Sequence, residues 1–168
     1  HMTLLAHIVQ KENEILTQPL LDHIVQVGDM AGKIGNEVGI PAIMRVIGYL
    51  HDVGKADDKF QKYIIGNNRD HVNHSSAGGC VFLDLIDIHL HSQEDDPCFA
   101  YFKEVVSYCI FAHHGLFDQV QFREKWIIKY DERISEYRND PDYSYSSIQQ
   151  FVELELSPYL QKQYDDTL

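Results

Sequence analysis

The sequence has few cysteines, and their arrangement excludes two common small-protein scaffolds. Only three are present among 168 residues, namely Cys80, Cys98 and Cys109, and no two of them form a Cys-x-x-Cys pair. An odd count without this spacing argues against a disulfide framework and against a zinc ribbon. Free thiols are typical of a reducing compartment, so we expect a cytoplasmic protein.

Long apolar runs are also missing. No stretch approaches the roughly 18–20 uninterrupted apolar residues that a membrane-spanning helix needs, so the sequence predicts no membrane partner. A chain of 168 residues is long enough to bury a core of its own. We therefore expect one domain over residues 1–168.

Positive charge is scarce. The chain has 14 Lys and Arg against 26 Asp and Glu, which gives a formal net charge of −12. This balance excludes a protein that holds nucleic acid with a broad basic surface. The acidic excess lies mainly beyond residue 84, where 16 acidic residues accompany 7 basic ones. Chemistry on nucleic acid is still compatible with this charge where metal ions and a partner protein supply the positive charge.

Clean strand alternation is absent, and the apolar spacing is helical nearly throughout. Prolines suited to helix starts stand at Pro19, Pro41 and Pro97, and Gly35 is predicted to end the first helix. The run from Ala77 to Ile88 is apolar almost all round. A helix of that kind belongs at the centre of a fold.

Three further helices are expected. One follows Asp57, one begins at Asp118 and carries Phe122 and Trp126 at helical spacing, and the last begins at about Ser146. Aromatic side chains of the second of these could stack on nucleic-acid bases, but core packing explains their spacing better. The predicted architecture is all-α.

Histidine, in contrast, is abundant, with ten in the chain. Five of them lie beside apolar sequence at predicted helix ends or on inner faces. A single buried imidazole is satisfied by one or two hydrogen bonds, but five in one small domain are satisfied together by a shared metal ion. Imidazole with carboxylate suits Mn, Fe, Co, Ni or Zn better than Ca. The predicted metal ligands are His23, His51, Asp52, His74, His113 and His114.

The most specific local string is His51-Asp52-Val53-Gly54-Lys55, at the end of the second predicted helix. One carboxylate can bridge two ions, and two metal ions about 3.5–4 Å apart can activate a water and clamp a phosphate. The ammonium of Lys55 lies about one turn further on, where it can neutralise phosphate charge or assist the leaving group. We therefore predict catalytic roles for Asp52 and Lys55.

This string resembles the signature of the HD phosphohydrolase superfamily. The run from Leu50 to Ala56, followed by Phe60-Gln61, resembles the HD nuclease domain of the type I CRISPR-associated nuclease-helicase. Three more segments resemble motifs of that family in the expected order, and the resemblance spans roughly residues 19–118. These segments are Pro19-Leu20-Leu21-Asp22-His23, His74-Ser75-Ser76-Ala77-Gly78-Gly79 and Ala112-His113-His114-Gly115-Leu116.

The resemblance implies an all-α HD-domain bundle with a metal site in a central cleft. The implied ligands are His23, His51 and Asp52 for one ion, and Asp52, His74, His113 and His114 for the second. Lys55 would face the scissile phosphate. One or two ions of Mn, Fe, Co or Ni are implied, with Mg as a further candidate.

The same resemblance implies a substrate and partners. The reaction would be cleavage of phosphodiester bonds in single-stranded DNA, as part of CRISPR interference and antiviral defence. A helicase module or subunit would deliver the strand after the CRISPR surveillance complex has opened the target duplex.

Two features depart from the family pattern. No helicase motif and no P-loop are present, so we expect a stand-alone subunit, a domain shortened at its C-terminus or a divergent copy. The family's final metal-binding Asp also lacks its usual apolar context, and the remaining candidates are Asp118, Asp131, Asp165 and Asp166. Near the start, the segment Leu4-Leu5-Ala6-His7 resembles a short Ala-His segment of the family. We expect His7 to support the site from outside or to be structural.

Two other functions stay open. An HD phosphohydrolase acting on a nucleotide or a cyclic dinucleotide would share the His-Asp string. Cyclic-dinucleotide members, however, add Gly-Tyr-Pro after the paired histidines, where this chain has Gly115-Leu116-Phe117. A non-catalytic docking domain would keep the HD fold, but buried imidazoles are costly to satisfy without metal. The leading prediction is therefore a metal-dependent nuclease for single-stranded DNA.

Overall fold

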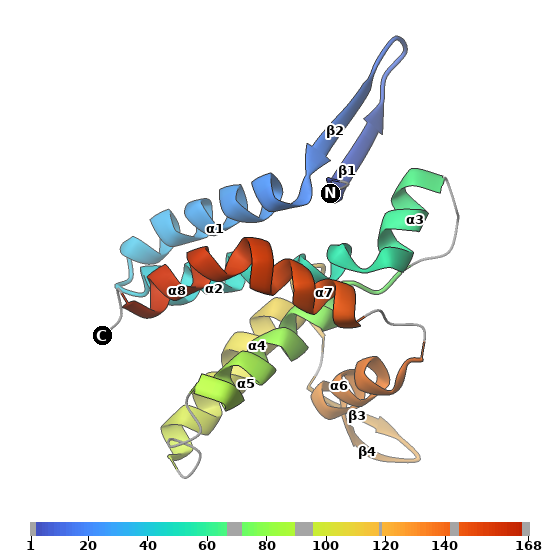
Figure 1. Ribbon diagram of the computed structural model, residues 1–168. Coiled ribbons are helices and arrows are strands. Elements are labelled where there is room, and N and C mark those ends of the chain that lie inside the picture. The colour runs from blue at the N-terminus through green and yellow to red at the C-terminus, as the bar shows by residue number, and fades with distance from the viewer. Residues whose placement is uncertain (1–2, 67–71, 90–95, 118, 142–144, 166–168) are drawn as a thin grey trace.

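A computed structural model describes residues 3–66, 72–89, 96–117, 119–141 and 145–165 of the chain (Figure 1). Its fold is mostly helical, which confirms the predicted class. The helices are α1 (Leu20–Asn36), α2 (Pro41–Leu50), η1 (Val53–Ala56), α3 (Asp58–Gly66), α4 (Ser75–His89), α5 (Pro97–Phe111), α6 (Lys129–Asn139), α7 (Tyr145–Phe151), η3 (Val152–Leu156) and α8 (Ser157–Asp165). The strands are β1 (Leu5–Gln10), β2 (Ile15–Pro19), β3 (Val120–Arg123) and β4 (Lys125–Ile128).

Prolines mark three helix starts, as predicted. Pro41 and Pro97 are the first residues of α2 and α5, and Pro19 immediately precedes α1. Proline fits these positions because its φ is already helical and it has no N–H group to leave unpaired. The carboxylate of Asp96 also accepts a hydrogen bond from the backbone N–H of Cys98 at 2.9 Å, which caps α5. Helix α1 extends one residue past its predicted end at Gly35.

Helix α4 lies in the interior, as its apolar sequence predicts. Residues 75–82 are all buried, and α4 packs alongside α5 (Figure 1). The amide oxygen of Asn73 accepts hydrogen bonds from the hydroxyl of Ser75 at 3.1 Å and from the backbone N–H of Ser76 at 3.4 Å. These bonds fix the chain where it enters α4, and they thereby position His74.

The hydrophobic core joins the two halves of the chain. Helices α1 and α8 both pack against α2, and α7 and η3 bring the last part of the chain back over the core (Figure 1). Fully buried apolar side chains include Leu20, Ile24, Leu50, Val53, Ile110, Phe111, Ile148 and Leu156. Several of these side chains lie near the start of α1 and the ends of α2 and α5, so they hold those helix ends in place.

Two β-hairpins correct the sequence prediction. Strands β3 and β4 cover residues 120–128, so the helix expected from Asp118 is wrong over its first part, and α6 begins only at Lys129. Asp118 itself lies outside the described residues. The spacing of Phe122 and Trp126 fits one face of a helix, but it also fits cross-strand partners on one face of a hairpin. No Asn-Gly or Asp-Gly pair signals the turn, which instead places Glu124 at a φ of 57°.

The first hairpin, β1 with β2, was not predicted either (Figure 1). Exposed apolar side chains such as Val9 and Ile15 blur the alternation that would mark these strands. The hairpin projects from the start of α1, and the backbone N–H of Leu20 donates to the carbonyl of Leu4 at 2.8 Å. Strand β1 therefore reaches the same region of the molecule as the first turn of α1.

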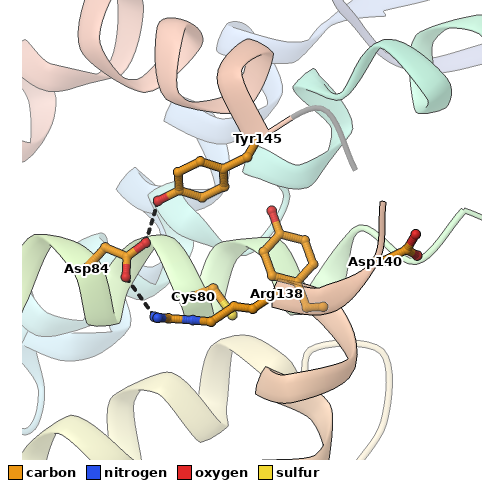
Figure 2. A pocket seen from close by; sticks show the side chains of 6 residues that line it. Cys80, Asp84, Arg138, Asp140 and Tyr145 are labelled. Carbon is orange, nitrogen blue, oxygen red and sulfur yellow. Dashed lines mark hydrogen bonds and ion pairs between the residues drawn. The ribbon is translucent and has the colours of Figure 1, made fainter. Parts of the chain in front are cut away.

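Helices α4, α6 and α7 meet around a polar pocket, shown in Figure 2. Asp84 on α4 accepts a hydrogen bond from Arg138 on α6 at 2.7 Å and another from the hydroxyl of Tyr145 on α7. These contacts fasten the C-terminal helices to α4. Among the helices of the described segments, none combines the length and apolarity needed to cross a bilayer.

Candidate metal centre

The ends of four helices and η1 meet at one place, and all six predicted ligands lie there. The carboxyl ends of α2 and α5 meet the amino ends of α1 and α4. The ligands are His23 in the first turn of α1, His51 at the end of α2, Asp52 before η1, His74 before α4, and His113 and His114 after α5.

Two glycines allow the elements to approach this closely. A Cβ atom added to Gly54 would lie 2.1 Å from the carbonyl oxygen of His74, and one added to Gly78 would lie 2.0 Å from that of Leu50. A side chain at either position would force the backbones apart. The glycine of the His-Asp string therefore serves to bring His74 beside Asp52.

One oxygen of Asp52, Oδ2, faces the first predicted group. His23 Nε2 lies 2.9 Å and His51 Nε2 lies 3.3 Å from Oδ2, and the two nitrogens are 3.3 Å apart. Nitrogen and oxygen ligands that share one ion at about 2.0–2.2 Å lie about 3 Å from each other. These three atoms therefore have the spacing of ligands to a single metal ion.

The other oxygen of Asp52, Oδ1, faces the second predicted group. The Nε2 atoms of His74 and His113 each lie 3.3 Å from Oδ1. His114 joins this group, because its Nε2 lies 2.7 Å from Nε2 of His74. One donor atom from each of the four residues lies within 4.8 Å of the others. The carboxylate thus divides its two oxygens between two sets of imidazoles.

Backbone carbonyl groups set the orientation of three rings. The Nδ1 atoms of His51 and His113 lie 2.6 Å and 2.8 Å from the carbonyl oxygen three residues earlier, and Nδ1 of His74 lies 3.3 Å from the one two residues earlier. A carbonyl oxygen only accepts, so each Nδ1 carries the proton. The lone pair of each neutral ring is then on Nε2, which is the atom that points toward Asp52.

Two atoms of this cluster lack a hydrogen bond among the described residues. They are Oδ1 of Asp52 and Nε2 of His113, both buried and 3.3 Å apart. A buried acceptor without a partner is costly, and two acceptors facing each other add repulsion. A cation bound to both atoms removes that cost, so the residues present fit a metal ion.

The protonation states also suit a metal. The Nζ atom of Lys55 lies 2.8 Å from Oδ2 of Asp52, and this ammonium favours the charged form of the carboxylate. Burial and the neighbouring His113 and His74 lower the pKa of His114 to about 4. At neutral pH these groups are a carboxylate and a neutral imidazole, which are the forms that bind metal.

Lys55 lies inside the cluster. Its Nζ atom is 2.8 Å from Oδ2 of Asp52 and 3.4 Å from both the carbonyl oxygen of Ala6 and Nε2 of His7. The side chain is buried, so the ammonium neutralises the carboxylate from within the fold. Its predicted contact with a scissile phosphate stays a prediction.

His7 belongs to the cluster, although the sequence pointed only to a supporting role. Strand β1 brings a ring nitrogen of His7 to within 4.8 Å of the ligand atoms of His23 and Asp52. Burial, together with the charge of Lys55, lowers the pKa of His7, so its ring is neutral at neutral pH. The Ala-His segment was the sole sequence signal, and it could not show where an unpredicted strand would lie.

The Phe60-Gln61 pair holds this hairpin against the centre. The amide oxygen of Gln61 accepts from the N–H of Leu5 at 3.0 Å, and its nitrogen donates to the carbonyls of Leu5 at 2.9 Å and Lys55 at 2.6 Å. The ring of Phe60 lies 5.3 Å from that of His74 and 5.7 Å from Nζ of Lys55. The pair therefore positions both His7 and Lys55.

The final metal-binding Asp of the family pattern stays open. In the described part of the chain, Asp52 is the only carboxylate in either group of candidate ligands. Asp131 is exposed in the first turn of α6. Asp118 and Asp166 lie outside the described residues, as does the side chain of Asp165.

Comparisons with known proteins agree with this geometry. The profile of the HD domain family matches residues 20–138, which include every predicted ligand. The chain is 44% identical over 43 residues to Ribonuclease Y from two strains of Dehalococcoides mccartyi. That stretch covers 25% of this chain and 8% of each relative. No solved structure matches. The chain belongs to the HD domain family, whose members are metal-dependent phosphohydrolases.

Proposed function

We propose that the protein is a metal-dependent phosphodiesterase that cleaves single-stranded nucleic acid, with single-stranded DNA as its substrate. The observation that supports this most is the division of the Asp52 carboxylate, with Oδ2 facing His23 and His51 and Oδ1 facing His74 and His113. A carboxylate placed in this way can bridge two ions, which is the arrangement used by many enzymes that hydrolyse phosphodiesters.

In this proposal, one ion is held by His23, His51 and Asp52 and the other by Asp52, His74, His113 and His114. When bound, such ions supply positive charge for the phosphate and lower the pKa of a bound water. The backbone carbonyls that accept from Nδ1 keep the imidazoles aimed at the ions. Lys55 balances the charge of Asp52 and holds β1 in place.

The preference for DNA rests on the order of motifs between about residues 19 and 118, which resembles the CRISPR-associated HD nucleases. We extend the proposal accordingly to a helicase partner and to the CRISPR surveillance complex. The acidic net charge of −12 supports delivery by another protein, because the chain alone has little basic surface to capture a strand.

RNA is the second candidate substrate. It is favoured by the 44% identity over 43 residues to proteins named Ribonuclease Y. Both substrates are phosphodiesters and would use the same centre. The 2′-hydroxyl group is the feature through which a protein distinguishes them.

The test compares the wild type with Asp52→Asn, which keeps the size of the side chain and removes its charge. We expect the variant to lose bound metal and to lose cleavage of single-stranded DNA in the presence of Mn. Asp22→Asn is the control, because Asp22 lies next to His23 and is exposed. Metal content is measured by elemental analysis, and cleavage by gel electrophoresis of labelled strands.

A substrate panel of single-stranded DNA, single-stranded RNA, duplex DNA, nucleoside triphosphates and cyclic dinucleotides separates the alternatives. Selective cleavage of the small nucleotides would show a different HD phosphohydrolase. Full activity of a metal-free Asp52→Asn sample would contradict the proposal.

A further inference from the structure

The candidate ligands form two groups, named here for the Asp52 oxygen that each contains. The Oδ2 group is Oδ2 with His23 and His51, and the Oδ1 group is Oδ1 with His74, His113 and His114. The two oxygens differ in their other partners. Nζ of Lys55 lies 2.8 Å from Oδ2, whereas Oδ1 has no hydrogen bond among the described residues. Positive charge therefore reaches the carboxylate from one side.

The ammonium of Lys55 is held firmly at this place. It has three N–H groups to donate, and three acceptors lie around it. These are Oδ2 of Asp52 at 2.8 Å, and the carbonyl oxygen of Ala6 and Nε2 of His7, both at 3.4 Å. The amide of Gln61 also donates to the backbone carbonyl of Lys55 at 2.6 Å. Because the side chain is buried as well, its charge is a fixed part of the centre.

This fixed charge opposes an ion in the Oδ2 group. A metal ion bound to Oδ2 would lie about 2.0–2.2 Å from that oxygen. Since Nζ of Lys55 lies 2.8 Å from the same atom, the ion and the ammonium could be at most about 5 Å apart. The repulsion between a divalent and a monovalent cation at this distance corresponds to at least about tenfold in affinity, even when it is screened as in water.

The Oδ1 group has the opposite balance. Nδ1 of His74 and Nδ1 of His113 face backbone carbonyls, so each ring keeps its lone pair on Nε2. Oδ1 of Asp52 and Nε2 of His113 are buried acceptors 3.3 Å apart, and neither has a hydrogen bond among the described residues. A cation relieves the cost of both atoms at once. The Oδ1 group therefore gains more from an ion than the Oδ2 group does.

We propose that the two groups bind metal unequally, with the first ion in the Oδ1 group and with Lys55 keeping the affinity of the Oδ2 group low. This inference rests on the proposed function, because it concerns the ions of the same centre. Lys55 thereby sets how many ions the centre holds. One ion is bound when metal is scarce, and the second is added only when metal is abundant.

His51 and His113 are a matched pair for the first test. Each follows the end of a helix, and Nδ1 of each ring lies near the carbonyl oxygen three residues earlier. We expect His113→Gln to abolish tight binding of Mn²⁺, whereas His51→Gln should keep one ion with an affinity close to that of the wild type. Isothermal titration calorimetry measures both affinities. The reverse result, or equal losses in the two variants, would overturn the inference.

Lys55→Met tests the cause of the inequality, because methionine keeps an unbranched side chain and removes the charge. We expect the second Mn²⁺ to bind at least about tenfold more tightly than it does to the wild type. Electron paramagnetic resonance should then show a coupled Mn²⁺ pair at a lower metal concentration. Lys62→Met is the control, because Lys62 is exposed on α3 and should not affect metal binding.

Circular dichroism checks that these variants fold. An unchanged affinity for the second ion in folded Lys55→Met would overturn the inference. If Lys55→Met does not fold, the comparison of His51→Gln with His113→Gln still decides the matter, because both of these variants keep Lys55.

Hydrolysis assays separate this inference from the proposed function. One tightly and one weakly bound Mn²⁺ in a wild type that hydrolyses no DNA, RNA or nucleotide would support the inference and contradict the proposed function. Two ions of equal affinity in an active wild type would contradict the inference and leave the proposed function standing. A wild type that binds no Mn²⁺ would overturn both.

Discussion

The carboxylate of Asp52 is the residue-scale link between two sets of imidazoles. Each of its oxygens faces at least two Nε2 atoms, at distances of 2.9–3.3 Å. The structure brings these residues together, and the sequence indicated the grouping because adjacent His51 and Asp52 must share one helix end. The sequence also predicted inward-facing histidines from their apolar neighbours. Local sequence therefore carried most of the information about this part of the site.

His7 shows where that information ends. Its neighbours in sequence do not indicate a metal site, and its position depends on Gln61 pairing with the backbone of Leu5, 56 residues earlier. A contact over such a distance in sequence depends on the packing of the whole fold. The predicted supporting role of His7 was therefore reasonable from the sequence, although its ring lies within 4.8 Å of two candidate ligand atoms.

We predict that His7→Ala weakens Mn²⁺ binding about 10- to 100-fold, as is usual when a group beside a metal ligand is removed. Isothermal titration calorimetry measures the effect. Val9→Ala, also exposed on β1, is the control and should bind like the wild type. Equal Mn²⁺ affinity for His7→Ala and the wild type would show that His7 takes no part in the centre.

At the scale of elements, proline and apolar spacing predicted the helices well, whereas the hairpins were missed. In β3 and β4, Phe122 and Trp126 have a spacing that suits a helix face and a cross-strand pair equally. The turn between them has no glycine, so local turn chemistry could not decide the matter. The docking of α6 on the end of α5 favours the observed arrangement, and that contact is visible only in the fold.

The approach of η1 to α4 gives a prediction at this scale. Gly54→Ala places a methyl group where the carbonyl oxygen of His74 lies, only 2.1 Å from the ideal Cβ position. We expect a loss of about 3 kcal/mol in the free energy of unfolding, and weaker metal binding because His74 moves away from Asp52. Urea denaturation measures the first effect, and calorimetry with Mn²⁺ measures the second.

Gly66→Ala at the end of α3 is the matched control. A Cβ atom there meets no atom of another element within 4 Å in the described part of the chain. Alanine also favours helix more than glycine does, so this variant should change stability by less than about 1 kcal/mol, in the stabilising direction. If Gly54→Ala were as stable as this control, the close contact between η1 and α4 would be wrong.

The packing of α4 against α5 predicts unequal thiol reactivity. Cys80 is buried on α4, and burial raises the pKa of its thiol to about 11. Cys98 and Cys109 are exposed on α5. At pH 8 a thiol reagent such as DTNB should therefore label two cysteines rapidly in the folded protein and the third only after unfolding in urea. Rapid labelling of Cys80 in folded protein would contradict its position.

At the scale of the whole molecule, net charge predicted only the absence of a broad basic surface. It could not show how the charges are distributed in space, because that needs the fold. Arg123 and Lys125 are cross-strand partners, so they face the side of the hairpin opposite Phe122 and Trp126. Arg123 and Lys129 both lie against Glu132, which offsets their charge.

The candidate ligands also give a prediction for the stability of the whole fold. They lie at the ends of α1, α2, α4 and α5 and on β1, so a bound ion would join all of these elements. An ion that binds only the folded chain stabilises it by about 2.7 kcal/mol at a concentration 100 times its Kd. For a chain of this size, that corresponds to a rise in Tm of about 5–10 °C. Differential scanning fluorimetry with and without Mn²⁺ measures the shift, and EDTA should reverse it. Asp52→Asn should show no shift, since it loses the carboxylate shared by both groups, whereas an unchanged wild-type Tm at saturating Mn²⁺ would mean that no ion joins these elements.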